Sequence, residues 1–214
     1  MATQILLLTG MTPDARIFER LFELLPTASV VPWIPPAAHE CIQEYACRLA
    51  DSISVRGDVV VCGVSFGGII AQELAIQLNA RACVLISSVR GVRQLPPWYR
   101  MLRPFAIGPV EAILGAVGLA ADLCPARLRT NSTTRLTKLA GDAGAWHRWA
   151  TASVLRWVPS RELEKLRIVQ IHGGHDTTFP MRYVNPDVVI ANGGHVLPLT
   201  HPTEIAAVLG NVAA

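Results

Sequence analysis

The chain has 214 residues, of which 51% are hydrophobic and only 16% are charged, and this balance excludes an intrinsically disordered protein. The length predicts a single globular domain, because it is enough to bury a full core without metals or disulfides. The formal net charge is +3, from 19 basic and 16 acidic side chains. Such a small and dispersed charge is not typical of polyanion-binding surfaces, so we expect no nucleic acid among the partners.

The cysteines and the N-terminal residues predict a cytoplasmic protein. The five cysteines include no Cys-x-x-Cys pair, and an odd number cannot complete a set of internal disulfides. Residues 1–10 contain neither a basic segment nor a signal cleavage site. Residues 105–121 are nearly uncharged, but glycine, proline and glutamate interrupt them. We interpret this run as a buried or pocket-lining helix, without stable membrane insertion.

Short apolar runs alternate with amphipathic stretches in the first part of the chain. In chain order we predict a strand at residues 5–8, a helix at about 14–25, a strand at 30–34, a helix at 39–53, a strand at 59–62, a helix at 67–78 and a strand at 83–87. This alternation is typical of βαβ units, which form parallel sheets with helices on both faces.

The alternation stops after residue 89, where proline and glycine punctuate helical pieces, and it resumes after residue 160. The later predicted elements are helical pieces at 110–123 and 131–157, strands at 168–171 and 188–191, and a closing helix at about 202–212. We therefore predict one α/β domain over residues 1–214, with a mostly parallel, six-stranded, doubly wound sheet and a helical cap insertion at 90–160. Ligands are expected at the carboxyl ends of the strands.

A Gly-x-Ser-x-Gly pentapeptide, Gly63 to Gly67, lies between a predicted strand and a predicted helix. A serine on such a tight turn adopts a strained backbone, and the flanking glycines let neighbouring segments approach closely. We predict Ser65 as a nucleophile. A simpler interpretation is a small-residue turn in which Ser65 caps the following helix. The other site residues must decide, because a serine hydroxyl is a poor nucleophile without a base and an acid.

Two loops near the end of the chain offer that base and that acid. His195 directly follows the predicted strand at 188–191, and Asp176 is the only acid in the loop after the strand at 168–171. Both loops leave the carboxyl end of a parallel strand, where they can reach Ser65. Alternatively, His195 only hydrogen-bonds its loop backbone, and Asp176 is a turn residue beside glycine.

Together these segments resemble the α/β-hydrolase family, in particular its small bacterial esterase-like members, over essentially the whole chain. The similar segments are Thr9-Gly10-Met11 after the first strand, the nucleophile segment 63–68, the acid segment 172–180 and the histidine segment 193–195. The chain order Ser65, Asp176, His195 is also that of the family. The resemblance implies the α/β-hydrolase fold and a Ser-His-Asp triad.

The resemblance further implies an oxyanion hole formed by the backbone N–H groups of Met11 and Phe66. The sequence departs from the family pattern at Thr9-Gly10, where His-Gly is common, and it lacks the usual strands before the first central one. A backbone donor does not require the preceding histidine, and the missing strands belong to the sheet edge. We expect both departures to be tolerated.

We expect no cofactor and no metal, because the remaining histidines fall on separate elements and form no His-x-x-x-His pair. The predicted activity is hydrolysis of a carboxylic ester or thioester of a small, largely apolar substrate through an acyl-enzyme. Serine at position 65 argues against dehalogenases and epoxide hydrolases, which attack with a carboxylate. A carbon–carbon hydrolase or lactonase, a ligand-binding protein with little turnover, docking of residues 105–119 on lipid, and a homodimer all remain compatible with the sequence.

Overall fold

The computed structural model describes residues 2–103 and 143–214, which fall into two compact units. The first unit combines Met1–Pro97 with Trp157–Ala214, and the second is Trp98–Arg156. All three predicted triad residues belong to the first unit. Among the described residues, no helix has both the length and the apolar character needed to cross a lipid bilayer.

The described part of the second unit is helical. It contains most of α4 (Pro97–Leu102) and all of α7 (Ala143–Arg156), in which the ring centroids of Trp146 and Trp149 lie 5.4 Å apart. The helix predicted at 110–123, the apolar run 105–121, the proposed lipid contact at 105–119 and Cys124 lie outside the described residues. The assignment of 90–160 as a cap stays a prediction.

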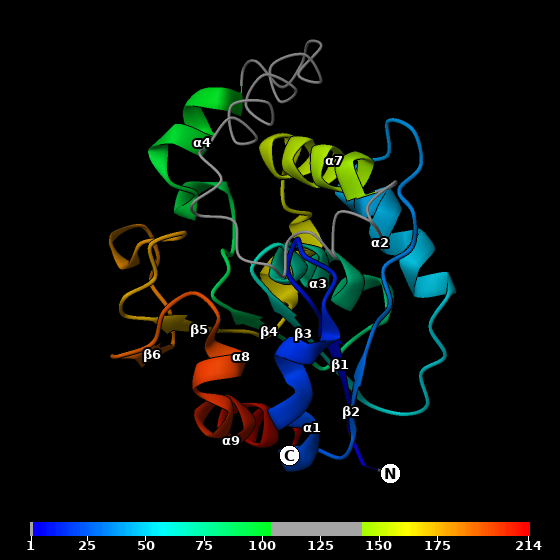
Figure 1. The fold of residues 1–214 in the computed structure, drawn as a ribbon. Helices are drawn as coiled ribbons and strands as arrows, with labels where there is room; N and C mark the ends of the chain where they lie inside the picture. Colours follow the sequence, from blue (N-terminus) through cyan, green and yellow to red (C-terminus); the bar gives the residue numbers. More distant parts are fainter. Residues whose placement is uncertain (1, 104–142) are drawn as a thin grey trace. The chain divides into compact units, whose positions relative to one another are not determined.

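The first unit is built on six parallel strands, as the alternation of the sequence predicts (Figure 1). They are β1 (Gln4–Leu8), β2 (Ala28–Val30), β3 (Val59–Val64), β4 (Ala82–Ile86), β5 (Ile168–Gly173) and β6 (Val188–Ile190), in the spatial order β2-β1-β3-β4-β5-β6. The edge strand β2 ends at Val30, earlier than predicted. Pro32 follows closely, and a proline has no N–H to donate to the neighbouring strand.

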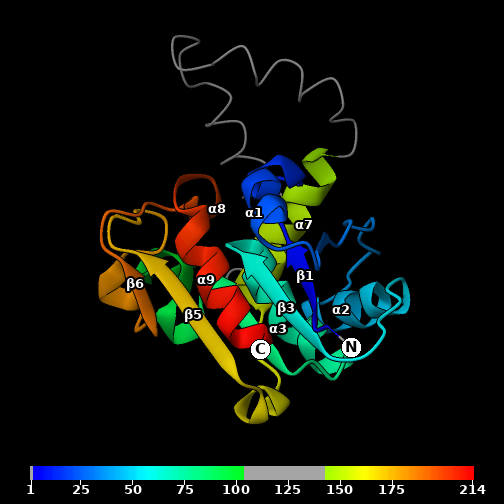
Figure 2. The ribbon, with the colours of Figure 1, turned by 90° about the horizontal axis from the view of Figure 1, so that it is seen from below.

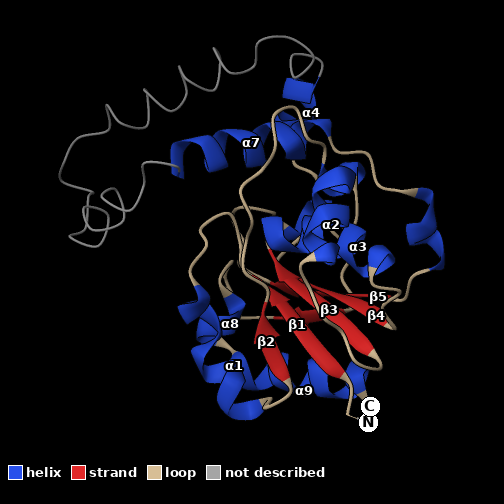
Figure 3. Ribbon diagram, turned by 90° about the vertical axis from the view of Figure 1, so that its right-hand side faces the viewer, coloured by secondary structure: helices blue, strands red, loops and turns tan. Residues whose placement is uncertain are grey.

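Helices cover both faces of this sheet, so the doubly wound prediction is confirmed (Figure 3). On one face lie α2 (Ile42–Asp51) and α3 (Phe66–Gln77). On the other lie α1 (Glu19–Leu24), α8 (Leu197–Thr200) and α9 (Pro202–Ala213), and Figure 2 shows α9 running alongside the strands, between β5 and β3 in that view. The helix predicted at 14–25 is divided, because a 3-10 turn, Ala15–Phe18, precedes α1.

The core is densest around the two central elements that flank the predicted nucleophile. Every residue of β3 and β4 is buried, and so is every residue of α3 from Phe66 to Ala75. A helix that is apolar around most of its surface is typically buried on all sides, and each fully buried aliphatic side chain contributes about 1.5–3 kcal/mol to stability. The strand and the helix that join at Ser65 are therefore rigid supports.

A buried carboxylate fixes the chain where it returns from the second unit. Glu73 of α3 is 1% exposed and accepts hydrogen bonds from the Trp157 indole (2.9 Å) and from the Ser160 hydroxyl (2.5 Å) and N–H (3.2 Å). The Gln43 amide of α2 donates to the same carboxylate at 3.2 Å. These donors satisfy the oxygens of the buried side chain, which would be costly to bury without hydrogen bonds. They also tie the start of the 157–168 segment to α3.

The parallel strands bring their carboxyl ends to one edge of the sheet. The order β2-β1-β3-β4 reverses direction between β1 and β3, and ligands bind at such switch points in open α/β sheets. Thr9 and Gly10 follow β1, and Ser65 follows β3. The loops that carry Asp176 and His195 follow β5 and β6 at the same edge.

Candidate active site

Ser65 occupies a strained turn between β3 and α3. Its φ of 53° and ψ of −120° lie in a region that non-glycine residues rarely adopt, so neighbouring groups must hold it there. Its N–H donates to the carbonyl of Ile86 at the end of β4, at 3.0 Å. Its carbonyl accepts from Gly68 N–H at 3.0 Å and from the Ser88 hydroxyl at 2.6 Å. Both sides of the Ser65 backbone are thus fixed.

The glycines of the pentapeptide are required by backbone contacts. A Cβ at Gly63 would lie 2.2 Å from the carbonyl oxygen of Gly67, and one at Gly67 would lie 2.0 Å from the carbonyl oxygen of Thr9. Real Cβ atoms do not approach backbone this closely, so larger residues would separate β1, β3 and α3. The Ser65 side chain forms no capping hydrogen bond to α3. The interpretation of Ser65 as a simple helix cap is therefore wrong.

A continuous line of hydrogen bonds joins Ser65, His195 and Asp176. The Nε2 atom of His195 lies 3.0 Å from Ser65 Oγ, and its Nδ1 atom lies 2.8 Å from Asp176 Oδ2. The carboxylate accepts from Nδ1–H, which leaves Nε2 as the acceptor for the serine proton. The structure thus brings together the three predicted residues, which are 130 and 19 positions apart along the chain in these two contacts.

Asp176 is a buried carboxylate whose side chain has no exposed area. Its Oδ1 atom accepts from the backbone N–H groups of Thr178 (2.8 Å) and Phe179 (2.9 Å). Burial works to raise the pKa of Asp176, but the hydrogen bonds from His195 and Phe179 outweigh burial and lower this pKa below its ordinary value. Asp176 is therefore charged near neutral pH. It is also the turn residue that the simpler interpretation expected.

The loops after β5 and β6 support each other through close backbone contacts. A Cβ at Gly173 would lie 2.4 Å from the carbonyl oxygen of Gly194, and the N–H of His175 donates to the carbonyl of Gly193 at 2.9 Å. The Phe179 ring meets the His195 ring edge-on, with centroids 5.8 Å apart. Asp176 and His195 therefore lie on two loops that are held together by direct contacts.

The sequence of this chain matches the sequence model of a known family over residues 6–208, and that family is described as the Alpha/beta hydrolase family. The chain belongs to the alpha/beta hydrolase family. Among curated proteins, none matches the sequence significantly.

Solved structures with the same fold include several esterases and related enzymes. One is a thermophilic esterase from Thermogutta terrifontis, with 19% identity, 100% of this chain and 92% of that chain covered, and a TM-score of 0.62. Another is a lipase-esterase related protein from Clostridium acetobutylicum, with 14% identity, coverages of 98% and 94%, and a TM-score of 0.64. A third is the RedJ thioesterase of the prodiginine biosynthetic pathway in Streptomyces coelicolor, with 16% identity, coverages of 98% and 85%, and a TM-score of 0.61.

In this alpha/beta hydrolase, the two residues predicted for the oxyanion hole belong to the segments that run beside the nucleophile. Phe66 is the first residue of α3, directly after Ser65. Met11 follows Gly10, and a Cβ at Gly10 would lie 3.6 Å from Ser65 Cβ. The loop after β1 therefore passes directly beside Ser65. Donation by these two backbone N–H groups to a substrate oxygen stays a prediction.

Sequence reasoning missed Trp33, which braces this loop. Its indole N–H donates to the Thr9 hydroxyl at 2.7 Å, and its ring lies 6.0 Å from the Phe66 ring and 6.2 Å from the Tyr45 ring. Thr9 stands where the family commonly has histidine, and in this hydrolase its hydroxyl is the acceptor that fixes the loop. In the sequence, a tryptophan in a segment flanked by prolines gives no indication that it contacts the loop after β1.

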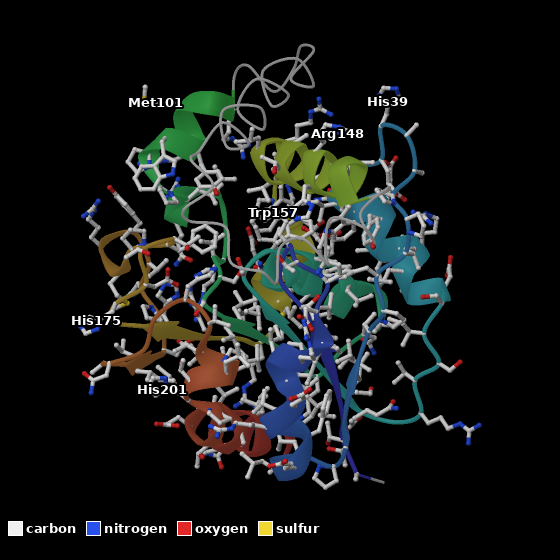
Figure 4. All side chains as sticks on the ribbon, viewed as in Figure 1. His39, Met101, Arg148, Trp157, His175 and His201 are labelled. Carbon is white, nitrogen blue, oxygen red and sulfur yellow. The ribbon has the colours of Figure 1, made fainter. Side chains whose placement is uncertain are left out.

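The remaining histidines do not form a metal site within residues 2–103 and 143–214, where no group of three or more His, Cys, Asp or Glu side chains could hold an ion. Figure 4 shows His39, His175 and His201 on separate loops, apart from one another. His172 differs from these histidines because it is fully buried and lies beside Asp176. No pattern in the sequence assigns a role to His172.

Proposed function

We propose that this protein is a serine hydrolase that cleaves a carboxylic ester or thioester of a small, largely apolar substrate through an acyl-enzyme. The observation that carries the proposal is the line from Ser65 Oγ to His195 (3.0 Å) and from His195 to Asp176 (2.8 Å), with Ser65 on a strained turn. A nucleophile, a base and an orienting acid within hydrogen-bond reach define this chemistry.

In the first step, Ser65 Oγ attacks the substrate carbonyl carbon while its proton passes to His195 Nε2. A C–O bond forms, and the carbonyl π electrons move to the substrate oxygen. His195 becomes a cation, and the buried Asp176 carboxylate at 2.8 Å stabilises that cation without accepting its proton. A carboxylate kept ionised by its hydrogen bonds to His195 and Phe179 suits this role.

The negative oxygen that forms needs donors fixed in advance. We assign them to the backbone N–H groups of Phe66, which directly follows Ser65, and of Met11, which follows Gly10 in the loop beside Ser65. One such donor contributes about 3 kcal/mol to the transition state. Trp33 would hold the Met11 loop in place by its bond to the Thr9 hydroxyl.

The tetrahedral intermediate then expels its leaving group, and His195 returns the proton to the departing alcohol oxygen or thiol sulfur. This leaves an acyl group on Ser65 Oγ. A water molecule loses a proton to the same Nε2 atom, attacks the acyl carbon, and releases the carboxylic acid with Ser65 restored. The chain's own residues balance every proton, so the proposed reaction requires no metal and no cofactor.

Ester and thioester substrates differ only in the atom that leaves, and the three residues serve both. The similar structures include an esterase and a thioesterase. The apolar preference is supported by two exposed apolar side chains close after the base: Val196 directly follows His195 and is 40% exposed, and Leu199 lies four positions after His195 and is 47% exposed. The proposed partner is therefore a small-molecule ester. The free thiols of Cys41, Cys47, Cys62 and Cys83 support a reducing, cytoplasmic location.

The test is labelling with a fluorophosphonate probe, which reacts only with an activated serine. Wild-type protein should label, Ser65→Ala should not, and Ser29→Ala, which changes an exposed serine on β2, should label like wild type. A panel of p-nitrophenyl esters and thioesters of increasing acyl length then defines the substrate class. Turnover of these substrates by Ser65→Ala at the wild-type rate would refute the assignment.

One different function is tested by the same experiment. If folded wild-type protein neither labels nor hydrolyses the panel, the site binds a small ligand rather than transforming it. If the protein labels but leaves esters and thioesters intact, lactones and substrates with cleavable carbon–carbon bonds are tested next, because these reactions use the same three residues.

A further inference from the structure

His172 is a fully buried histidine that the proposed mechanism does not use. It lies on β5, four positions before Asp176, with a side chain that has no exposed area. Its Nε2 atom lies 2.7 Å from the carbonyl oxygen of Phe179 and 3.3 Å from Asp176 Oδ2. The acid is therefore approached by two histidines from two different elements.

The surroundings of His172 determine its tautomer. A carbonyl oxygen can only accept, so the 2.7 Å contact requires a proton on Nε2. The Nδ1 atom is buried without a hydrogen-bond partner, so nothing there stabilises a second proton. Burial lowers the pKa of His172, which agrees with a neutral ring near neutral pH. His172 therefore acts as a neutral donor.

The residue that receives this donation touches both the acid and the base. Phe179 donates its N–H to Asp176 Oδ1 at 2.9 Å, and its ring meets the His195 ring at 5.8 Å. Its carbonyl is fixed by His172. Both polar atoms of the Phe179 backbone are thus held, one by the acid and one by His172, and its ring is positioned against His195.

We propose that His172 is a positioning residue that fixes the turn from Asp176 to Phe179 and so orients His195 toward Ser65. The hydrogen bond to the Phe179 carbonyl closes the turn, and the same Nε2 atom lies 3.3 Å from Asp176 Oδ2, the oxygen that accepts from Nδ1–H of His195. This inference rests on the proposed function, because orientation of His195 is measured by reactivity of Ser65.

If His172 only fills space in the core, substitutions at position 172 should have different effects from those expected for a hydrogen-bond donor. A leucine fills a similar volume but leaves the buried Phe179 carbonyl without its donor, at a cost typical of an unsatisfied buried group. A glutamine places its amide nitrogen close to where His172 carries Nε2, whereas an asparagine is shorter and matches Nδ1. The three substitutions therefore separate packing from donation at Nε2.

The experiment compares His172→Gln, His172→Asn and His172→Leu with wild type, and uses His175→Gln as the matched control, because His175 is an exposed histidine in the loop that follows β5. For each variant we measure the fluorophosphonate labelling rate, kcat and KM for an ester that wild type hydrolyses, and the melting temperature. We expect His172→Gln to stay within about threefold of wild type. We expect His172→Asn and His172→Leu to lose about tenfold or more in kcat and labelling rate with KM little changed.

The outcomes distinguish this inference from the proposed function. Wild-type protein that neither labels nor hydrolyses any substrate refutes the proposed function itself. Active wild type with a fully active His172→Leu refutes only the positioning role. Equal losses in the glutamine and leucine variants also refute it, because donation at Nε2 would then not matter. If His172→Leu does not fold, the comparison of glutamine with asparagine carries the test.

Discussion

Substituting Asp176 by asparagine should give His195 the wrong tautomer while leaving the fold intact. The orientation of the new amide follows from the structure. In the wild-type protein, Oδ1 of Asp176 accepts hydrogen bonds from the backbone N–H groups of Thr178 at 2.8 Å and Phe179 at 2.9 Å. In the variant, the amide oxygen must therefore take the Oδ1 position. The amide NH2 then occupies the Oδ2 position, 2.8 Å from Nδ1 of His195.

A donor at that position can be satisfied only if Nδ1 of His195 becomes the acceptor. The ring proton then lies on Nε2, which faces Ser65 Oγ at 3.0 Å and can no longer take its proton. The expected loss in kcat/KM is about 10³- to 10⁴-fold, which corresponds to about 4–5.5 kcal/mol of transition-state stabilisation. Because both backbone bonds to the amide oxygen are kept, melting temperature should fall far less than activity.

The assay is ester hydrolysis together with the fluorophosphonate labelling rate, and circular dichroism melts report the fold. Asp51→Asn is the matched control, because Asp51 is an exposed acid on α2, remote in sequence from the site segments. A folded Asp176→Asn protein that keeps more than a tenth of the wild-type kcat/KM would refute the reasoning, because the tautomer would then be irrelevant to reaction.

Two further predictions concern residues that surround Ser65, His195 and Asp176. Trp33→Phe keeps an aromatic ring but removes the 2.7 Å bond to Thr9, so kcat should fall about three- to tenfold, as expected for one lost hydrogen bond, and an unchanged kcat would contradict bracing of the Met11 loop. Because burial lowers the pKa of His172 below 6.5, the unfolded chain binds a proton below pH 6.5 that the folded protein does not. The free energy of unfolding should therefore fall as pH drops below about 6.5, with up to about 1.4 kcal/mol per pH unit from this group. When the free energy of unfolding from urea titrations is plotted against pH, His172→Gln should show a smaller slope than wild type.

The sheet and the three central residues were predictable because their signals are local. Each strand is a short apolar run, and Ser65, Asp176 and His195 each follow such a run at its carboxyl end. Parallel pairing then brings these ends to one edge without further information. The predicted bounds of β2 were less accurate, because Trp33 and Ile34 continue the apolar pattern beyond Pro32, where strand pairing has ended.

Trp33 and His172 could not be found in this way, because their contacts depend on three-dimensional proximity. Trp33 donates to Thr9 across 24 positions and between two loops. His172 has the position of an ordinary strand residue, and only the turn after β5 brings Phe179 back over it. A sequence identifies the residues that carry out the chemistry by type and spacing, but residues that support them have no fixed type.

The same distinction explains how the strained conformation of Ser65 is maintained. Its N–H is held by Ile86, and its carbonyl is held by the Ser88 hydroxyl, so two residues that flank Ser87 at the end of β4 fix the nucleophile from one side. Ser87 itself has a positive φ of 48°. Neither strained residue could persist alone, since each such conformation costs about 1–3 kcal/mol. The hydrogen bonds between β4 and the Ser65 turn therefore stabilise a geometry that local sequence disfavours, and this geometry points Ser65 Oγ at His195.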